Sequence, residues 1–212
     1  MRTHQKIQVN VGTKELNILS PAKQTKLLIE QNNVHTDASF ITQPTFIRGK
    51  NFEYSTEDAR QIFEAGKEYR WVDIRSLRFE SDRVVRTDRT KNPVTITVKP
   101  DFTRNDQRAI FYMDTNGWTS IASTELINPW WQGDYAYVNF TYVPAGLKAL
   151  PNKEIYLVGQ LTGHTLGDTA QMEFDPGVGA YTKTLLLKQG FYNYTYLTKE
   201  KGAPFYLSLI HI

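Results

Sequence analysis

The sequence predicts an all-β protein built as tandem β-sandwiches, and three observations carry this prediction. Aromatic residues make up 13% of the 212 residues, twelve of them tyrosines, and aromatic side chains pack well on pleated sheets. Short segments alternate polar and apolar residues between turn signals, as strands do. No segment joins a helical apolar stripe of period 3.6 to capping residues at both of its ends.

The expected strands of a first sandwich fill residues 1–147. Alternation is strictest in DYAYVNFTYV, residues 134–143, where one face would carry Ala136, Val138, Phe140 and Tyr142. Asn116 and Gly117 predict a type I′ hairpin turn, because both residue types tolerate a positive φ. A short helix is expected at 56–66, after a candidate N-cap at Thr56. The remaining strands are expected at 6–11, 25–30, 69–79, 93–100, 108–114 and 118–123.

A segment with two prolines and a glycine, PAGLKALPNKE at 144–154, interrupts the strand pattern and predicts a linker. Beyond it, turns at 175–179 and 188–190 separate another series of short strands. These strands are expected at 154–161, 170–174, 180–187 and 190–197. We therefore expect a second, smaller β-sandwich over residues 148–206.

The composition argues against several classes of function. The chain has no cysteine, which excludes disulfides, thiolate metal sites and cysteine nucleophiles. The net charge is +3 with acids and bases interspersed, whereas a nucleic-acid binder gathers its basic residues on one face. No histidine pair, carboxylate pair in a cleft, phosphate-binding glycine loop or EF-hand spacing is present. We expect no enzyme activity, no metal and no cofactor.

One stretch, EYRWVDIRSLRFESDRVVR at 68–86, packs five arginines, four acids and a tryptophan together. It has two interpretations. Cross-strand pairs between arginines and carboxylates are an ordinary feature of sheets. Alternatively, arginines and aromatic residues together mark a protein-docking face, since these residue types are enriched at interfaces.

A second stretch, NPWWQGDY at 128–135, places two tryptophans side by side. Adjacent residues of an extended chain point to opposite sides, so one of the two would be exposed and available to a partner or a sugar. The alternative is that both pack beneath a loop. Together the two stretches give the candidate partner-docking residues Arg70, Trp71, Arg75, Arg78, Trp130 and Trp131.

Residues 63–84, FEAGKEYRWVDIRSLRFESDRV, resemble a signature segment of the type IX secretion system plug proteins of Bacteroidota. Other segments similar to that family follow one another in the same order, so the resemblance spans about residues 3–198. They are THQKIQVNV, QPTFIRGKNFEY, YMDTNGWT, DYAYVNFT, YLVGQLT and LLLKQGFYNYTYL.

The resemblance implies a non-enzymatic periplasmic protein that binds and seals the periplasmic opening of the type IX outer-membrane translocon barrel. The barrel is then the expected partner, the arginines and tryptophans are docking anchors, and neither nucleic-acid binding nor direct membrane insertion is expected. Family members are longer at both ends and carry a signal peptide, so we expect this chain to be a fragment that lacks one.

The first sandwich is expected to be immunoglobulin-like, and the second resembles the early-set sandwiches attached to glycan-active enzymes. That likeness makes carbohydrate binding the alternative function. Gly163 and His164 stand where such sequences often place an aromatic residue, which disfavours a sugar site. Residues Leu207 to Ile212 resemble the translation of a transposon-end sequencing adapter, and we expect them not to be native.

Overall fold

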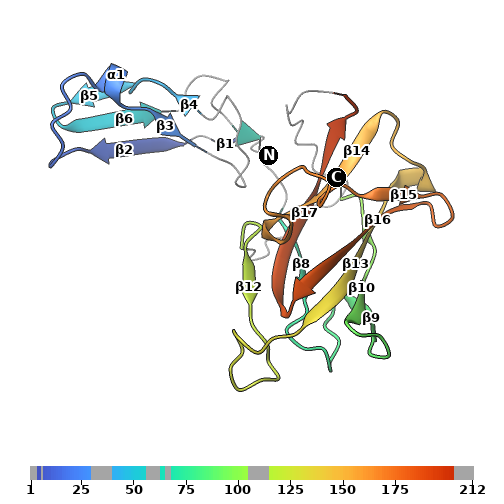
Figure 1. Ribbon diagram of the computed structural model, residues 1–212. Coiled ribbons are helices and arrows are strands. Elements are labelled where there is room, and N and C mark those ends of the chain that lie inside the picture. Colours follow the sequence, from blue (N-terminus) through green and yellow to red (C-terminus); the bar gives the residue numbers. More distant parts are fainter. Residues whose placement is uncertain are drawn as a thin grey trace. The chain divides into compact units, whose positions relative to one another are not determined.

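The computed structural model describes residues 4–5, 7–29, 40–55, 63–64, 68–104 and 115–202. The chain divides into two compact units, Met1–Gly66 and Lys67–Ile212. Regular structure in the described residues is nearly all strand (Figure 1), and the predicted all-β sandwich class is confirmed. None of the helices in these ranges has the length and apolar character needed to cross a bilayer.

The first unit holds short antiparallel strands around a small core. Its largest described sheet has the order β2-β6-β5, and the buried apolar side chains of the unit's core are Ile41, Phe52 and Tyr54. Two further strand pairs are β1 with β7 and β3 with β4. The bounds are β1 His4–Gln5, β2 Gln8–Gly12, α1 Pro21–Gln24, β3 Leu27–Leu28, β4 Phe40–Ile41, β5 Phe46–Arg48, β6 Asn51–Ser55 and β7 Phe63–Glu64.

The second unit contains two facing sheets. The larger has the order β15-β16-β13-β10-β9, with β11 also along β13, and the smaller is centred on β17, which pairs with β8, β12 and β14. Strands β10 and β11 run parallel to β13. The bounds are β8 Arg70–Asp73, β9 Val84–Asp88, β10 Val94–Val98, β11 Asp101–Phe102, β12 Thr119–Ile121, β13 Tyr135–Val143, β14 Lys153–Val158, β15 Glu173–Asp175, β16 Ala180–Lys188 and β17 Gly190–Glu200.

The core of this unit follows from alternation along β13. Its inward residues are at most 1% exposed, as predicted, and they are Ala136, Val138, Phe140 and Tyr142. Aromatic rings of β17 meet them from the other sheet: the Phe140 and Tyr194 ring centroids lie 5.0 Å apart, edge to face. Such aromatic pairs stabilise beyond the area they bury, so the two sheets form one sandwich.

The predicted domain boundary at residue 147 was wrong. Strand β13, before that position, pairs with β16, after it, from Tyr135↔Lys188 to Tyr142↔Tyr181, and the chain divides between residues 66 and 67 instead. The expected linker is a connection with the 3-10 turn η3, Ala145–Leu147, which lies between strands of the two facing sheets. Proline and glycine mark such connections as well as linkers.

Two element predictions also needed correction, and one turn was right. The expected strand at 69–79 ends at Asp73, whose carboxylate accepts a hydrogen bond from the backbone N–H of Arg75. The helix expected at 56–66 lies outside the described residues except for Phe63–Glu64, which is a strand. Asn116 and Gly117 have φ of 49° and 84°, as a type I′ turn requires. Residues 108–114 and 207–212 are not among the described residues.

Candidate docking surface and the buried cluster beside it

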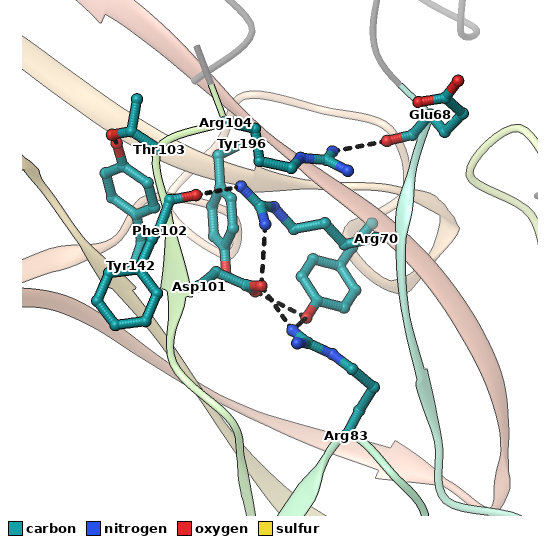
Figure 2. Close-up of polar contacts among 10 residues, drawn as sticks. Glu68, Arg70, Arg83, Asp101, Phe102, Thr103, Arg104, Tyr142 and Tyr196 are labelled. Atoms are coloured by element: carbon teal, nitrogen blue, oxygen red, sulfur yellow. Dashed lines mark hydrogen bonds and ion pairs between the residues drawn. The ribbon is translucent and has the colours of Figure 1, made fainter. Parts of the chain in front are cut away.

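Strand β8 turns Arg70 toward the interior instead of the surface. Val72 and Ile74, on the same face, are 0% exposed, and the Arg70 side chain is 9% exposed. Its Nη1 donates to the Asp101 carboxylate at 3.1 Å, and Arg83 Nη2 donates to the same oxygen at 2.5 Å (Figure 2). Arg70 therefore belongs to a buried ion-pair cluster, which does not suit a docking anchor.

Two tyrosines of β17 complete this cluster. The Tyr194 and Tyr196 hydroxyls donate to the other Asp101 oxygen at 2.8 and 2.9 Å. Burial first, and then the charge of Asp101, raises the pKa of both tyrosines well above the ordinary value. The cluster thus joins strands of both sheets through one carboxylate.

Asp101 is fully used by these contacts. A carboxylate has about four acceptor positions, and among the described residues Asp101 accepts four hydrogen bonds. No position is left on it to take a proton from a substrate, so the arrangement is that of a structural clasp and not of a general base.

Backbone carbonyls hold the arginines on the outer side of the cluster. Arg70 Nη2 donates to the Phe102 carbonyl and Arg104 Nη2 to the Glu68 carbonyl, each at 2.7 Å. Burial, followed by the nearby charge of Arg70, lowers the pKa of Arg104. The segment after β11 is thereby fastened to the segment that leads into β8.

Trp71, on the opposite face of β8, and Arg75, two residues beyond the end of that strand, also have partners within the unit. Arg75 binds Asp73 through both oxygens, with Nε to Oδ1 at 2.9 Å and Nη2 to Oδ2 at 2.6 Å. Burial raises the pKa of Asp73, but the hydrogen bonds and charge of Arg75 outweigh it and hold that pKa below its usual value. Trp71 stacks on Phe191 with ring centroids 5.7 Å apart.

Past Asp73 the chain turns and meets the loop 122–134. The Ser76 hydroxyl donates to Glu125, and the Arg78 backbone N–H donates to the same carboxylate at 2.8 Å. Burial raises the pKa of Glu125, but the bonds from Ser76 and Arg78 lower it overall. The Arg78 side chain itself is exposed, so this predicted arginine lies on the surface, and the Arg75 side chain is 42% exposed beside its Asp73 partner.

Trp130 and Trp131 are both exposed, so neither packs beneath a loop. Their side chains are 67% and 82% exposed, and they share this end of the unit with Ile127 at 95% and Phe79 at 78%. We call these four residues the end-loop surface. The two tryptophans were predicted as candidates, but Ile127 and Phe79 were not, because a lone apolar residue in a polar segment carries no signal of its own.

Gln189 ties the loops of this end together and was also missed. It is 2% exposed. Its Nε2 donates to the Arg75 carbonyl at 3.0 Å, and its Oε1 accepts from the Asp134 N–H at 3.0 Å. A glutamine in a tight turn between two strands is an ordinary surface pattern, so only the three-dimensional arrangement shows that it is buried.

His164, one of the two residues at which the chain departs from early-set sequences, lies beside a tryptophan. Trp118 is 53% exposed, and its ring meets His164 with centroids 5.8 Å apart. Burial lowers the pKa of His164. In the described part of the chain, no group of three or more His, Cys, Asp or Glu side chains is placed to hold a metal ion.

The second unit is thus a β-sandwich with a buried polar clasp and an exposed apolar end. No protein-family model matches the chain, and no curated protein does. Among solved structures it is similar to a hypothetical protein from Parabacteroides merdae ATCC 43184, with 28% identity and a TM-score of 0.83. The match covers 95% of this chain and 50% of that one, so the chain spans about half the length of that protein.

Proposed function

We propose that this chain is a non-enzymatic docking protein of the Bacteroidota periplasm, which seals the periplasmic opening of the type IX translocon barrel. The observation that carries the proposal is the end-loop surface: apolar side chains exposed by two thirds or more on loops held by hydrogen bonds. Tryptophan is among the residues that most often dominate protein interfaces. Closing a wide pore requires a fitted surface and no chemical step.

The signature segment supports the proposal through the fold. Two of its arginines have partners inside the unit: Arg70 binds Asp101, and Arg75 binds Asp73. A family resemblance carried by such residues indicates a shared scaffold, while recognition is left to the loops that the scaffold presents. The similar structure from Parabacteroides merdae comes from a member of the Bacteroidota, the phylum of the family that the sequence resembles.

Co-purification tests the proposal. The tagged chain should retain the translocon barrel from detergent extracts of Bacteroidota envelopes, and Trp131→Ala combined with Trp130→Ala should reduce the retained barrel by roughly tenfold or more, since a hot-spot tryptophan contributes about 2 kcal/mol or more. Both side chains are exposed, so the fold should persist. Phe102→Ala, which removes another ring that is 59% exposed, is the matched control. No retention of the barrel by the unaltered chain would refute the proposal.

A further inference from the structure

Arg104, which follows β11, is an arginine with unused hydrogen-bonding capacity. Its Nη2 donates to the Glu68 carbonyl at 2.7 Å, and among the described residues no carboxylate forms an ion pair with it. Its Nε is buried and has no hydrogen-bond partner in the described part of the chain. Since a guanidinium has five N–H donors, Arg104 can donate more bonds than the Glu68 carbonyl accepts.

The charges around Arg104 do not balance within the described residues. Arg70 and Arg83 share the single carboxylate of Asp101, and Figure 2 shows Arg104 beside this group. The carboxylates of Asp101 and Glu68 attract Arg104 from a longer distance, without an ion pair. Three arginines against these two acids leave an excess of one positive charge on this side of the unit.

Partial burial increases the effect of this excess charge. Arg104 is half-buried, and burial, followed by the charge of Arg70, lowers its pKa. A charge that water solvates only in part attracts an ion of opposite sign more strongly than a fully solvated charge does. Because part of the side chain remains accessible to solvent, an ion can reach it.

Folding alone explains this charge poorly. A partly desolvated arginine beside a second arginine lowers stability unless an anion compensates its charge. The bond from Arg104 to the Glu68 carbonyl fastens two segments of the chain, but an uncharged donor such as glutamine would serve that purpose. Charged groups held in unfavourable surroundings are typical of functional sites.

We propose that Arg104 binds an oxyanion, which is a carboxylate or a phosphate group. The planar fork of a guanidinium matches the spacing of two oxygens in either group, and such charge-assisted hydrogen bonds are short and strong. The anion would also compensate the excess charge beside Arg70 and Arg83. This inference does not depend on the proposed function, because the end-loop surface and the barrel take no part in it.

Urea unfolding in inorganic phosphate tests the inference, with chloride at equal ionic strength as the reference. A ligand that binds only the folded chain lowers the unfolding equilibrium constant. Above the dissociation constant, each tenfold rise in phosphate should lower that equilibrium constant by about tenfold, as a single site requires. Acetate in place of phosphate distinguishes the two sources: a response to acetate indicates acidic side chains of another protein, and a response to phosphate alone indicates a phosphorylated ligand.

Three variants assign the response to one side chain. Arg104→Met removes the charge, so the effect of phosphate should disappear. Arg104→Gln also removes the charge but keeps an N–H group for the Glu68 carbonyl, and it should lose the effect in the same way. Arg75→Met is the matched control: it removes an arginine that Asp73 already binds and that is 42% exposed, so the response to phosphate should be unchanged.

Two results would overturn the inference. One is an unaltered chain that phosphate and acetate stabilise no more than chloride does. The other is an equal response of Arg104→Gln, which would assign the effect to the general action of phosphate on folded proteins. If Arg104→Met does not fold, the comparison with Arg104→Gln still decides. Retention of the barrel enters none of these measurements, so the inference and the proposed function fail separately.

Discussion

The substitution Asp101→Asn removes the carboxylate charge with which Arg70 and Arg83 are paired and changes almost no volume. Arg70 and Arg83 would then face a neutral amide, with side chains 9% and 25% exposed. The amide has one acceptor oxygen, whereas the carboxylate accepts from two arginines and two tyrosines. At least one donor would lose its partner, and its desolvation is then uncompensated.

The expected cost is about 3 kcal/mol of unfolding free energy. Removing one partner of a buried ion pair costs about 3–5 kcal/mol. Because a quarter of the Arg83 side chain is exposed, water screens part of its charge, and the lower end of that range applies. A domain with a total stability of about 5–15 kcal/mol would lose a large share of it.

Urea unfolding followed by tryptophan fluorescence measures the cost of this change in the second structural unit of the chain. The four tryptophans are at 71, 118, 130 and 131, all within the unit Lys67–Ile212. Asp73→Asn is the matched control, because it breaks the more exposed pair with Arg75, whose side chain is 42% exposed. That change should cost no more than about 1 kcal/mol.

A second variant guards against a misleading result. In an Arg83→Met background one of the two arginines is gone, so Asp101→Asn should cost less than it does alone. A cost for Asp101→Asn below about 1 kcal/mol, or one equal to that of Asp73→Asn, would refute the interpretation of the cluster as a buried clasp.

Two further changes test other parts of the structure. The folded-state pKa values of Asp73 and Glu125 lie below their ordinary values of 3.8 and 4.5. Both carboxylates therefore contribute stability that is present above those values and is lost as the pH falls through the lowered values. Urea midpoints should be flat near neutrality and decline below about pH 4, and Asp73→Asn should reduce the decline. A Cβ at Gly159 would lie 2.5 Å from the Asn193 carbonyl oxygen, so Gly159→Ala should destabilise the unit by about 1–3 kcal/mol. The same change at Gly163, where nothing lies within 4 Å but φ is +66°, should cost only the smaller backbone term of about 1 kcal/mol; equal costs at both positions would contradict the close approach.

Local signals explain which parts of the fold could be predicted. The inward face of β13 and the turn at Asn116 and Gly117 depend on residues next to one another, and both are as predicted. The domain boundary depends on the pairing of β13 with β16, some 45 residues later. No composition shift marks a pairing over that distance, and the prolines near residue 147 pointed to a linker instead.

The candidate site shows the same limit. Exposure of at least one of two adjacent tryptophans was expected for an extended chain; the structure exposes both, but they lie in a turn, where the Trp131 and Gln132 N–H groups donate to the Asn128 carbonyl. The position of Arg70 could not be derived, because its partners lie elsewhere in the chain, at Asp101 and, through that carboxylate, Tyr194 and Tyr196. An arginine in a strand has the same sequence pattern whether its partner is a neighbouring protein or a buried aspartate.

Two groups of residues in this chain have different physical roles. The arginines at 70 and 75 are confined by internal partners, so a change there is felt first as lost stability. Trp130, Trp131 and Ile127 contribute little to the core, since each is at least 67% exposed, and folding alone gives no reason to keep them apolar. Their apolar character, together with the bonds that hold the loop, is therefore better explained by what binds this end of the molecule than by the fold. Variants of the two groups should separate accordingly, with stability lost in the first and binding in the second.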